Sequence, residues 1–346
     1  VFTPLHGTTY ELVPESLRNW GFTNIHTVPE QSIPDGDFPT VASANPEEPA
    51  AFKMALDLAR KIDADLTMAC DPDGDRIGIA VKDDKEEWTL LNGNQTNIVF
   101  TEYIIRRKKE LGLLKGGEYT VKTIVTTELI KDIAEKNNII CYDVYTGFKW
   151  IADVIRKEGG EKFIGGGEES FGYMPGAFTR DKDGVSATSL MAEIAAWVKM
   201  QNKTLYSFLK EIYAKYGFSQ ERMIYIVRKG LSGAQEIKAM MEEFRHNTPK
   251  EINHSPVVLK KDYLSLEATN LQTGEKTHLD FETKSDVLQF FLADGSKISV
   301  RPSGTEPKIK FYFEARAQMK DMNDYERVQQ DANARIDAII KDLKLQ

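Results

Sequence analysis

The stretch YTVKTIVTTELIKDIAEKNNIICYDV, residues 119–144, carries the pattern that decides the fold. Its two ends, YTVKTIV and IICYDV, are apolar and rich in β-branched residues, which favours strands. Between them the apolar residues of TELIKDIAEKN recur at helical spacing. Strand–helix–strand units of this length predict a parallel sheet covered by helices.

The same alternation extends outward in both directions, including an expected strand at residues 24–28. After about Phe218 the pattern changes, because β-branched and aromatic strands predominate and helices are expected only near residues 235–244 and 325–344. The sequence therefore predicts an α/β chain that ends in an α+β domain with an antiparallel sheet. The expected domains are residues 1–91, 92–217 and 218–346.

Composition narrows the class of protein. The 346 residues carry a net charge of −8, which argues against nucleic acid or an anionic membrane as the main partner. Cys70 and Cys141 both lie in apolar segments, so we expect buried, reduced thiols in a cytoplasmic protein. No signal peptide is recognisable, and no run approaches the roughly 18 apolar residues of a membrane span.

Three aspartates occupy every second position of ACDPDGDRIGIAV, residues 69–81. A solvated turn is the simplest interpretation, because Asp, Pro and Gly favour turns. However, three carboxylates this close repel one another, and Mg²⁺, Ca²⁺ or Mn²⁺ would offset that repulsion. Arg76 follows at once, and a cation beside a guanidinium suits a phosphate group. The candidate metal ligands are Asp71, Asp73 and Asp75.

A second motif, FIGGGEESFGY at residues 163–173, runs from an expected strand into three glycines and a polar group. It can be read as a glycine-rich turn and nothing more. It can also bring the backbone close to a ligand. A carboxylate at Glu168 beside a hydroxyl at Ser170 suits sugar hydroxyls better than phosphate, which the carboxylate would repel.

Two further loops precede expected helices. Thr146 and Gly147 open TGFKWIADV, where an N-cap alone would explain them. Arg180 and Lys182 lie in RDKDGV, which is either a charged surface loop or a source of phosphate contacts and a proton donor.

The fifth motif is SVRPSGTEPKIKFYFEA, residues 299–315, in which a loop separates two expected strands. An ordinary hairpin is one interpretation. The combination of basic groups, hydroxyls and free backbone N–H groups also makes an anion cradle. The candidate phosphate-binding residues are Arg301, Ser303, Gly304, Thr305 and Lys308.

Together, and in this order, the five motifs resemble the α-D-phosphohexomutase family, and GEESFGY is most similar to its phosphoglucomutase branch. The resemblance spans nearly the whole chain. It implies reversible conversion of glucose 1-phosphate and glucose 6-phosphate through a phosphoserine, with glucose 1,6-bisphosphate as intermediate and activator. It also implies two phosphohexomutase-type α/β domains, the first incomplete, before the C-terminal domain.

Carried over position by position, the resemblance assigns a role to each motif. The three aspartates would bind Mg²⁺ beside Arg76. Glu168 and Ser170 would bind O3 and O4 of the sugar, and the loop with Thr146 and Gly147 would read the rest of it.

The basic loops would handle protons and phosphate. The resemblance implies that Lys182 is a catalytic general acid or base and that Arg180 contacts the substrate. The phosphate that does not react would be held by Arg301, Ser303, Gly304, Thr305 and Lys308. Binding of that distant phosphate would position a substrate that must bind in two orientations.

One feature departs from the family pattern. Members have four domains, with the nucleophilic serine in a TASHNP-like loop of the first. The nearest string here is VASANPEEP, residues 41–49, which lacks the histidine, so we expect a surface loop without a role towards phosphate. The resemblance thus predicts that the serine domain and part of the second lie outside this sequence, and that the chain alone catalyses little.

Two alternatives stay open. Glu168 and Ser170 do not distinguish glucose from mannose at C2, so a phosphomannomutase or phosphoglucosamine mutase fits the same motifs. A non-catalytic sugar-phosphate-binding module is a second alternative, from a different class of protein.

Overall fold

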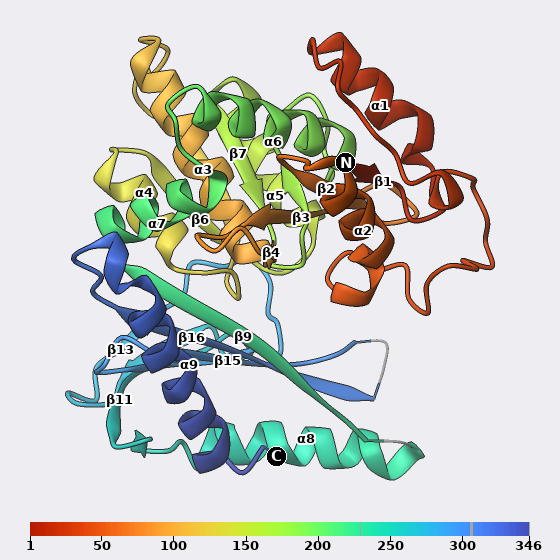
Figure 1. Cartoon of the computed structure of the whole chain (residues 1–346). Helices are drawn as coiled ribbons and strands as arrows, with labels where there is room; N and C mark the ends of the chain where they lie inside the picture. The colour runs from red at the N-terminus through yellow and green to blue at the C-terminus, as the bar shows by residue number, and fades with distance from the viewer. Residues whose placement is uncertain (229, 305–306, 346) are drawn as a thin grey trace. The chain divides into compact units, whose positions relative to one another are not determined.

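The computed structural model describes residues 1–228, 230–304 and 307–345, and the chain divides into two compact units (Figure 1). Unit 1 spans Val1–Tyr216 and unit 2 spans Gly217–Gln346.

Unit 1 contains two four-stranded sheets and the helices that surround them. Its helices are α1 (Thr9–Asn19), α2 (Lys53–Ile62), α3 (Gly93–Glu110), α4 (Leu129–Lys136), α5 (Phe148–Glu158), α6 (Gly184–Lys199) and α7 (Leu205–Tyr216). Its strands are β1 (Phe2–Thr3), β2 (Thr67–Cys70), β3 (Ile77–Lys82), β4 (Trp88–Leu91), β5 (Tyr119–Thr123), β6 (Ile140–Val144), β7 (Phe163–Gly167) and β8 (Tyr173–Met174).

The first sheet has the order β1-β2-β3-β4 and is mixed. Only β1 and β2 are parallel, whereas β3 and β4 run antiparallel to their neighbours. The expected parallel pairing therefore does not extend to β3 and β4, because residues 71–76 are too few for the crossover of a dozen or more residues that parallel strands need. The strand expected at residues 24–28 is reduced to one bridge, between Thr27 and Phe2.

The second sheet has the order β6-β5-β7-β8, with β5 parallel to both β6 and β7. This is the strand–helix–strand unit expected from residues 119–144. Helix α5 buries Ile151 and Ile155 against the sheet residues Tyr119, Val121 and Val144. Each fully buried aliphatic side chain contributes about 1.5–3 kcal/mol relative to exposure, so this packing stabilises the position of α5 on the sheet.

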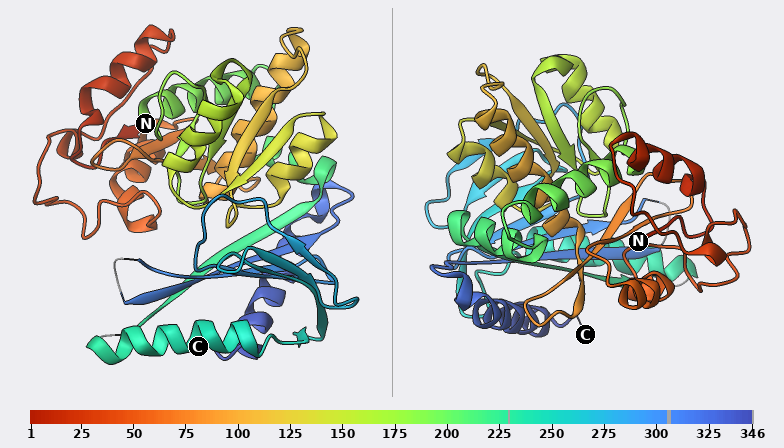
Figure 2. Two further views of the ribbon diagram at one scale, coloured as in Figure 1. Left: turned by 180° about the vertical axis from the view of Figure 1, so that it is seen from behind. Right: turned by 45° about the horizontal axis from the view of Figure 1, so that its top comes forward.

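Unit 2 is an antiparallel sheet with two long helices. Its strands are β9 (Phe218–Val227), β10 (Glu251–Ile252), β11 (Ser255–Asp262), β12 (Glu267–Asn270), β13 (Lys276–His278), β14 (Leu288–Leu292), β15 (Lys297–Pro302) and β16 (Lys308–Ala317). Helices α8 (Gly230–His246) and α9 (Tyr325–Asp342) lie on one face of the sheet in both orientations of Figure 2. The expected fold class, α/β with a C-terminal antiparallel sheet, is therefore confirmed.

The main path of this sheet follows the order β13-β12-β11-β14-β15-β16-β9. Ile309, Phe311 and Phe313 alternate along β16 and are buried, as expected where successive side chains of a strand point to opposite faces. Both α8 and α9 pack on β16, so these residues form the core of unit 2.

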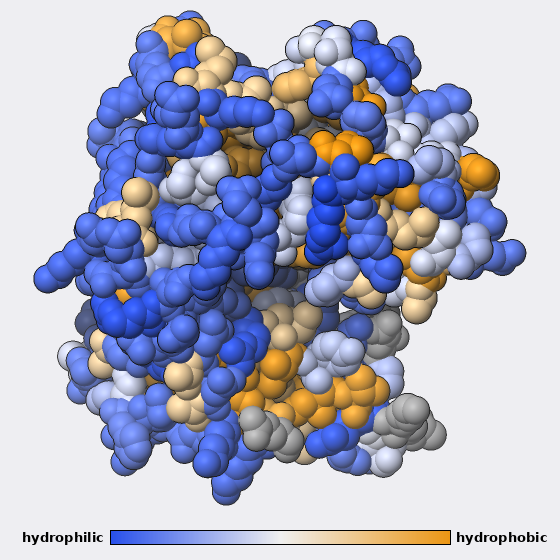
Figure 3. Space-filling view, in the orientation of Figure 1, coloured by the Kyte–Doolittle hydropathy of each residue, from blue (hydrophilic) through white to orange (hydrophobic). Residues whose placement is uncertain are grey.

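The face of the molecule in Figure 3 carries mainly hydrophilic residues, with separate hydrophobic areas. Among the helices of the described ranges, none combines the length and the apolar character needed to cross a lipid bilayer.

Candidate functional site

Three carboxylates converge in the loop between β2 and β3. Asp71, Asp73 and Asp75, called the acidic triad below, each offer an oxygen atom within 4.8 Å of the other two. The turn forms because the Gly74 N–H donates to the Asp71 carbonyl at 3.0 Å. The N–H groups of Asp75 and Arg76 donate to Asp71 Oδ1 at 3.0 and 2.9 Å and fix that side chain. The structure thus brings the three candidate metal ligands together.

The donor set of the acidic triad fits a hard divalent cation. Two oxygen atoms that each lie 2.0–2.6 Å from one ion can be at most about 5 Å apart, which matches the observed spacing. Burial raises the pKa of the Asp71 carboxyl to about 7, with the Arg76 N–H opposing and the charges of Asp75 and Asp73 adding to the rise. Asp75 Oδ1 is buried and has no hydrogen-bond partner among the described residues. A bound dication would satisfy both groups.

Two distant segments hold the backbone of this loop. The Thr8 N–H donates to the Pro72 carbonyl at 2.8 Å, and the Gly184 N–H donates to the Gly74 carbonyl at 3.0 Å. A Cβ atom on Gly7 would lie 2.3 Å from Pro72 Cα, so only glycine permits this approach. The sequence analysis did not identify these supporting residues, although the HG and DG pairs are a visible signal of tight turns.

Two basic side chains surround the acidic triad. Lys182 Nζ forms an ion pair with Asp75. Arg76 Nε lies 3.5 Å from Asp71 Oδ2, and Arg76 Nη1 donates to Glu47 Oε1 at 3.2 Å. Glu47 belongs to the loop at residues 41–49, which we expected to be a surface loop without a role towards phosphate. This contact links the loop to the arginine that follows the triad, and the expectation about phosphate stays a prediction.

The hairpin loop, residues 168–172, connects β7 to β8. The Glu168 N–H donates to the Gly172 carbonyl at 3.0 Å, and the Glu168 carboxylate accepts a hydrogen bond from the Gly147 N–H at the start of α5. Ser170 Oγ lies 3.5 Å from Glu168 Oε2. Gly147, Glu168 and Ser170 therefore lie together, and Thr146 directly precedes Gly147 in the chain.

The carboxyl of Glu168 in this loop has a raised pKa. Burial and then the charge of Glu169 raise its pKa to about 7, while the Gly147 N–H, Lys182 and Arg76 act in the opposite direction. A buried carboxyl with one backbone donor can accept or donate further hydrogen bonds to a neutral polyol. This arrangement suits sugar hydroxyls.

The hairpin loop and the acidic loop are joined to each other. The Ile77 N–H donates to the Phe171 carbonyl at 3.0 Å, and Arg76 forms a β-bridge with Gly172. The aliphatic part of Lys182 packs on Gly172, where a Cβ atom would come within 2.9 Å of Lys182 Cδ. The acidic triad, Glu168 and Lys182 thus form one group within unit 1.

Arg180 is not part of this group. Its guanidinium lies beside Gly160, 3.9 Å from where a Cβ atom on that residue would be. Gly160 precedes β7, whereas Glu168 follows it, so Arg180 is at the opposite end of the strand. The sequence motif RDKDG placed Arg180 two residues from Lys182, but the loop turns between them.

In unit 2 the predicted phosphate-binding residues lie in the hairpin between β15 and β16. The Ser303 N–H donates to the Lys308 carbonyl at 2.8 Å, and Arg301 pairs with Lys310 across the two strands. Lys308 Nζ lies 5.8 Å from the centre of the Tyr225 ring. Gly304 is exposed, and Thr305 lies outside the described residues.

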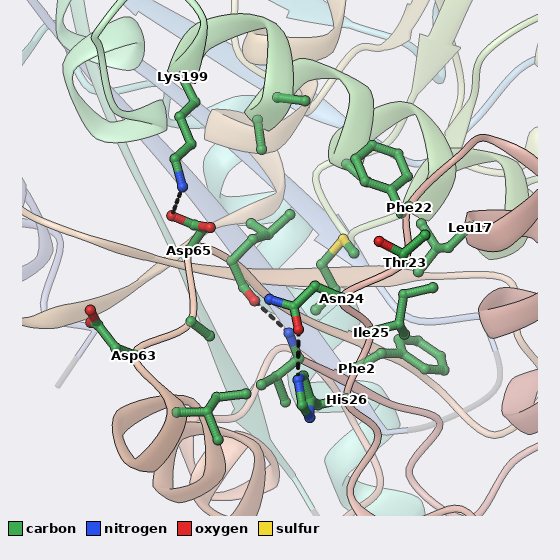
Figure 4. A pocket seen from close by; sticks show the side chains of 18 of the residues that line it. Phe2, Leu17, Phe22, Thr23, Asn24, Ile25, His26, Asp63, Asp65 and Lys199 are labelled. Atoms are coloured by element: carbon green, nitrogen blue, oxygen red, sulfur yellow. Dashed lines mark hydrogen bonds and ion pairs between the residues drawn. The ribbon is translucent and has the colours of Figure 1, made fainter.

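A cavity of about 370 Å³ lies elsewhere in unit 1 (Figure 4). In Figure 4, Lys199 faces Asp65 and His26 faces Asn24. The two members of each pair bond to one another, and the four side chains do not point at a common centre. Among the described residues that line the cavity, none belongs to the acidic triad or to the hairpin loop. The cavity is therefore separate from the candidate site.

Three domain models of one family match most of the chain. "Phosphoglucomutase/phosphomannomutase, alpha/beta/alpha domain II" matches residues 1–85, and "alpha/beta/alpha domain III" matches residues 92–216. The C-terminal domain model of the same family matches residues 237–331.

The curated relatives that match this chain are named phosphoglucomutase. A phosphoglucomutase of Staphylococcus aureus strain MRSA252 is 38% identical over 337 residues, which cover 97% of this chain and 59% of the relative. The enzyme of strain USA300 is 38% identical over 313 residues, covering 90% of this chain and 56% of its own length. The chain thus spans well under two thirds of the length of these relatives.

Solved structures share the fold at low sequence identity. Parafusin (phosphoglucomutase) from Paramecium matches with a TM-score of 0.64 and 18% identity, over 98% of this chain and 58% of that one. A phosphoglucomutase/phosphomannomutase family protein from Burkholderia thailandensis matches with a TM-score of 0.58 and 16% identity, over 98% and 60%. At this identity the likeness concerns the fold alone.

Proposed function

The chain belongs to the phosphoglucomutase/phosphomannomutase family, and we propose that it carries the metal-, sugar- and phosphate-binding residues of a Mg²⁺-dependent phosphoglucomutase. One observation carries the proposal: the oxygen atoms of the acidic triad lie within 4.8 Å of one another in a loop bridged to the Glu168 hairpin. This juxtaposition suits a ligand that has both a phosphate group and sugar hydroxyls.

We assign Mg²⁺ to the acidic triad, because all three donors are carboxylate oxygens. When bound, the ion supplies charge stabilisation to the phosphoryl group that is transferred. Arg76, held by Glu47, offers N–H donors to the phosphoryl oxygens. We assign to Lys182 the transfer of a proton to or from the reacting sugar hydroxyl, once its ion pair with Asp75 opens.

The remaining residues orient the substrate. Glu168 and Ser170 hydrogen-bond O3 and O4, and the loop at Thr146 and Gly147 lies beside them. The phosphate that does not react is assigned to the loop of unit 2. Its residues are Arg301, Ser303, Gly304, Thr305 and Lys308.

The proposed reaction is the reversible conversion of glucose 1-phosphate and glucose 6-phosphate. It passes through a phosphoserine and glucose 1,6-bisphosphate, which also serves as activator. The chain spans 59% of the length of its S. aureus relative, and we assign the phosphoserine to no residue among the 346. Ser43, in the loop most similar to the family's serine motif, donates instead to Glu48 at 2.9 Å.

The test is conversion of glucose 1-phosphate with Mg²⁺ and a trace of glucose 1,6-bisphosphate. The protein is expressed with any residues that its gene encodes before Val1. Asp73→Asn is expected to lower turnover at least about 10²-fold, because it weakens the charge stabilisation. The control is Asp57→Asn, on the exposed face of α2, which should leave turnover unchanged.

Two outcomes would contradict the proposal: no turnover of any hexose phosphate, or full turnover by Asp73→Asn. Mannose 1-phosphate and glucosamine 1-phosphate are assayed beside glucose 1-phosphate. Glu168 and Ser170 are assigned to O3 and O4, which glucose and mannose present alike, so these two residues leave the choice at C2 to other groups.

A further inference from the structure

The two adjacent glutamates of the hairpin loop have different partners. Glu168 accepts from the Gly147 N–H, whereas Glu169 Oε2 accepts from Thr126 Oγ1 at 3.1 Å and Thr123 Oγ1 at 3.2 Å. The two threonines are fully buried and lie at the end of β5 and in the turn after it. Glu169 therefore ties the hairpin loop to a neighbouring strand.

A buried lysine fixes the turn that holds Glu169. Lys122, which is 0% exposed, lies 2.7 Å from Asp143 Oδ1 and 3.2 Å from Glu128 Oε1. Its ammonium also donates to the carbonyl oxygens of Thr123 and Thr126, at 3.4 and 3.5 Å. A buried ion pair is a weak source of stability compared with apolar packing. Here it fixes the conformation of the turn at residues 123–126.

The other side of the hairpin loop rests on the start of α3. Asn97 Nδ2 donates to the Glu168 carbonyl at 2.8 Å and to the Gly93 carbonyl at 2.7 Å. A Cβ atom on Gly93 would lie 1.9 Å from the carbonyl oxygen of Glu169, so the helix backbone is in direct contact with the loop. The loop is thus held from two sides while the Glu168 carboxylate points to Gly147.

We propose that Glu169 is a positioning residue which, with Thr123, Thr126 and Lys122, holds the Glu168 carboxylate at the Gly147 amide for recognition of sugar hydroxyls. The inference rests on the proposed function for the nature of the ligand. Glu169 itself is directed away from Glu168 and its amide partner, into the buried hydroxyl pair.

Glu169 also acts on Glu168 through its charge. The charged groups that act on Glu168 are Glu169 in the same loop, Lys182 before α6 and Arg76 after the acidic triad. After burial, Glu169 makes the largest contribution to the raised pKa of Glu168. Removing the negative charge at residue 169 is therefore expected to lower that pKa, an effect that a merely structural role would not produce.

The first experiment tests the hydrogen bonds between Glu169 and the two threonines. The 346-residue chain is titrated with glucose 6-phosphate in the presence of Mg²⁺, and chemical shifts report binding. Thr126→Val removes one donor to Glu169 and is expected to weaken glucose 6-phosphate binding about fivefold to tenfold, the effect of one ordinary hydrogen bond. Thr126→Ser keeps the hydroxyl and should restore binding. Thr120→Val is the control, since Thr120 is buried in the same strand but donates to the Gly165 carbonyl.

The second experiment tests the charge. Glu169→Gln keeps the shape and one acceptor, and carbon-13 titration of the Glu168 carboxyl should give a pKa below the value of about 7 in the original chain. Glu135→Gln removes the same charge from the exposed surface of α4 and should not move the titration.

The inference is overturned if Thr126→Val binds like the original chain, or if Glu169→Gln leaves the Glu168 titration in place. Circular dichroism confirms that each variant is folded. Failure of the original chain to bind glucose 6-phosphate would count against the proposed function. The Glu168 titration needs no ligand and would still decide the role of Glu169.

Discussion

The acidic loop at residues 71–75 and the hairpin loop at residues 168–172 each place several carboxylates close together. The two loops differ in how far apart these residues are in the sequence and in whether their carboxylates converge. In the first loop the carboxylates lie at every second position of a tight turn and converge. In the second, Glu168 and Glu169 are adjacent and point to different partners. Spacing within a turn therefore decides whether like charges share one ion or take separate hydrogen bonds.

Burial raises the pKa of one carboxyl in each loop, Asp71 and Glu168, to about 7. The two loops differ in what can offset the cost of burying the ionised carboxyl. Asp71 has two carboxylates beside it, which a dication can neutralise together, whereas the Glu168 carboxylate accepts from the Gly147 N–H and Ser170 Oγ and has a neighbour of the same charge.

The largest expected effect is that of removing the metal ion from the acidic loop. Chelation by EDTA should lower turnover at least about 10²-fold, because the metal supplies several kcal/mol of charge stabilisation, and added Mg²⁺ should restore it. Asp75→Asn should prevent that recovery at moderate Mg²⁺ concentrations. Unchanged turnover in EDTA would show that the triad serves another purpose.

The second effect concerns the hairpin loop and depends on pH. Because the pKa of Glu168 is raised from 4.5 to about 7, its ionisation leaves folding unaffected below pH 4.5 and destabilises the folded state progressively up to pH 7. Glu168→Gln should therefore be more stable than the original chain above pH 7, by up to the order of 3 kcal/mol, with little difference at pH 4.5. Urea unfolding at both pH values measures this difference, and a pH-independent difference would contradict it.

A third change tests the close contact that holds the hairpin loop. Gly93→Ala places a methyl group against the carbonyl of Glu169, and such overpacking costs about 1–3 kcal/mol. The matched control is Gly36→Ala, whose Cβ atom would meet nothing within 4 Å. Comparison of the two unfolding free energies decides whether the helix start and the loop are in contact in solution.

The smallest effect separates ligand binding from loop structure. Ser170 Oγ lies 3.5 Å from Glu168, at the long end of hydrogen bonding. Ser170→Ala should change the unfolding free energy by less than about 0.5 kcal/mol while weakening glucose 6-phosphate binding. A large loss of stability would instead assign Ser170 to the loop structure.

The parts predictable from sequence were those set by local chemistry. The convergence of Asp71, Asp73 and Asp75 follows from a turn of five residues, and the strand–helix–strand pattern around residues 119–144 follows from periodicity. The antiparallel course of β3 was predictable from the length of the loop before it, since residues 71–76 are too few for a parallel crossover, but the apolar composition of β3 favours a buried parallel strand.

The supporting contacts were not predictable, because they join residues far apart in the chain. Gly93 meets Glu169 across 76 positions, and Asn97 meets Glu168 across 71. Arg180 shows the converse, because its closeness to Lys182 in sequence did not place it at the site. The position of a side chain two residues away depends on how the loop turns, and RDKDG allows several turns.

The backbone bonds from Thr8 and Gly184 to the acidic loop have a consequence for affinity. Segments from opposite ends of unit 1 clamp the loop, so its shape is established when the unit folds and not when an ion arrives. A cation that enters meets ligands already in place, and little chain entropy remains to be lost on binding. Loosening either clamp should therefore weaken metal affinity even though neither clamp contributes a ligand.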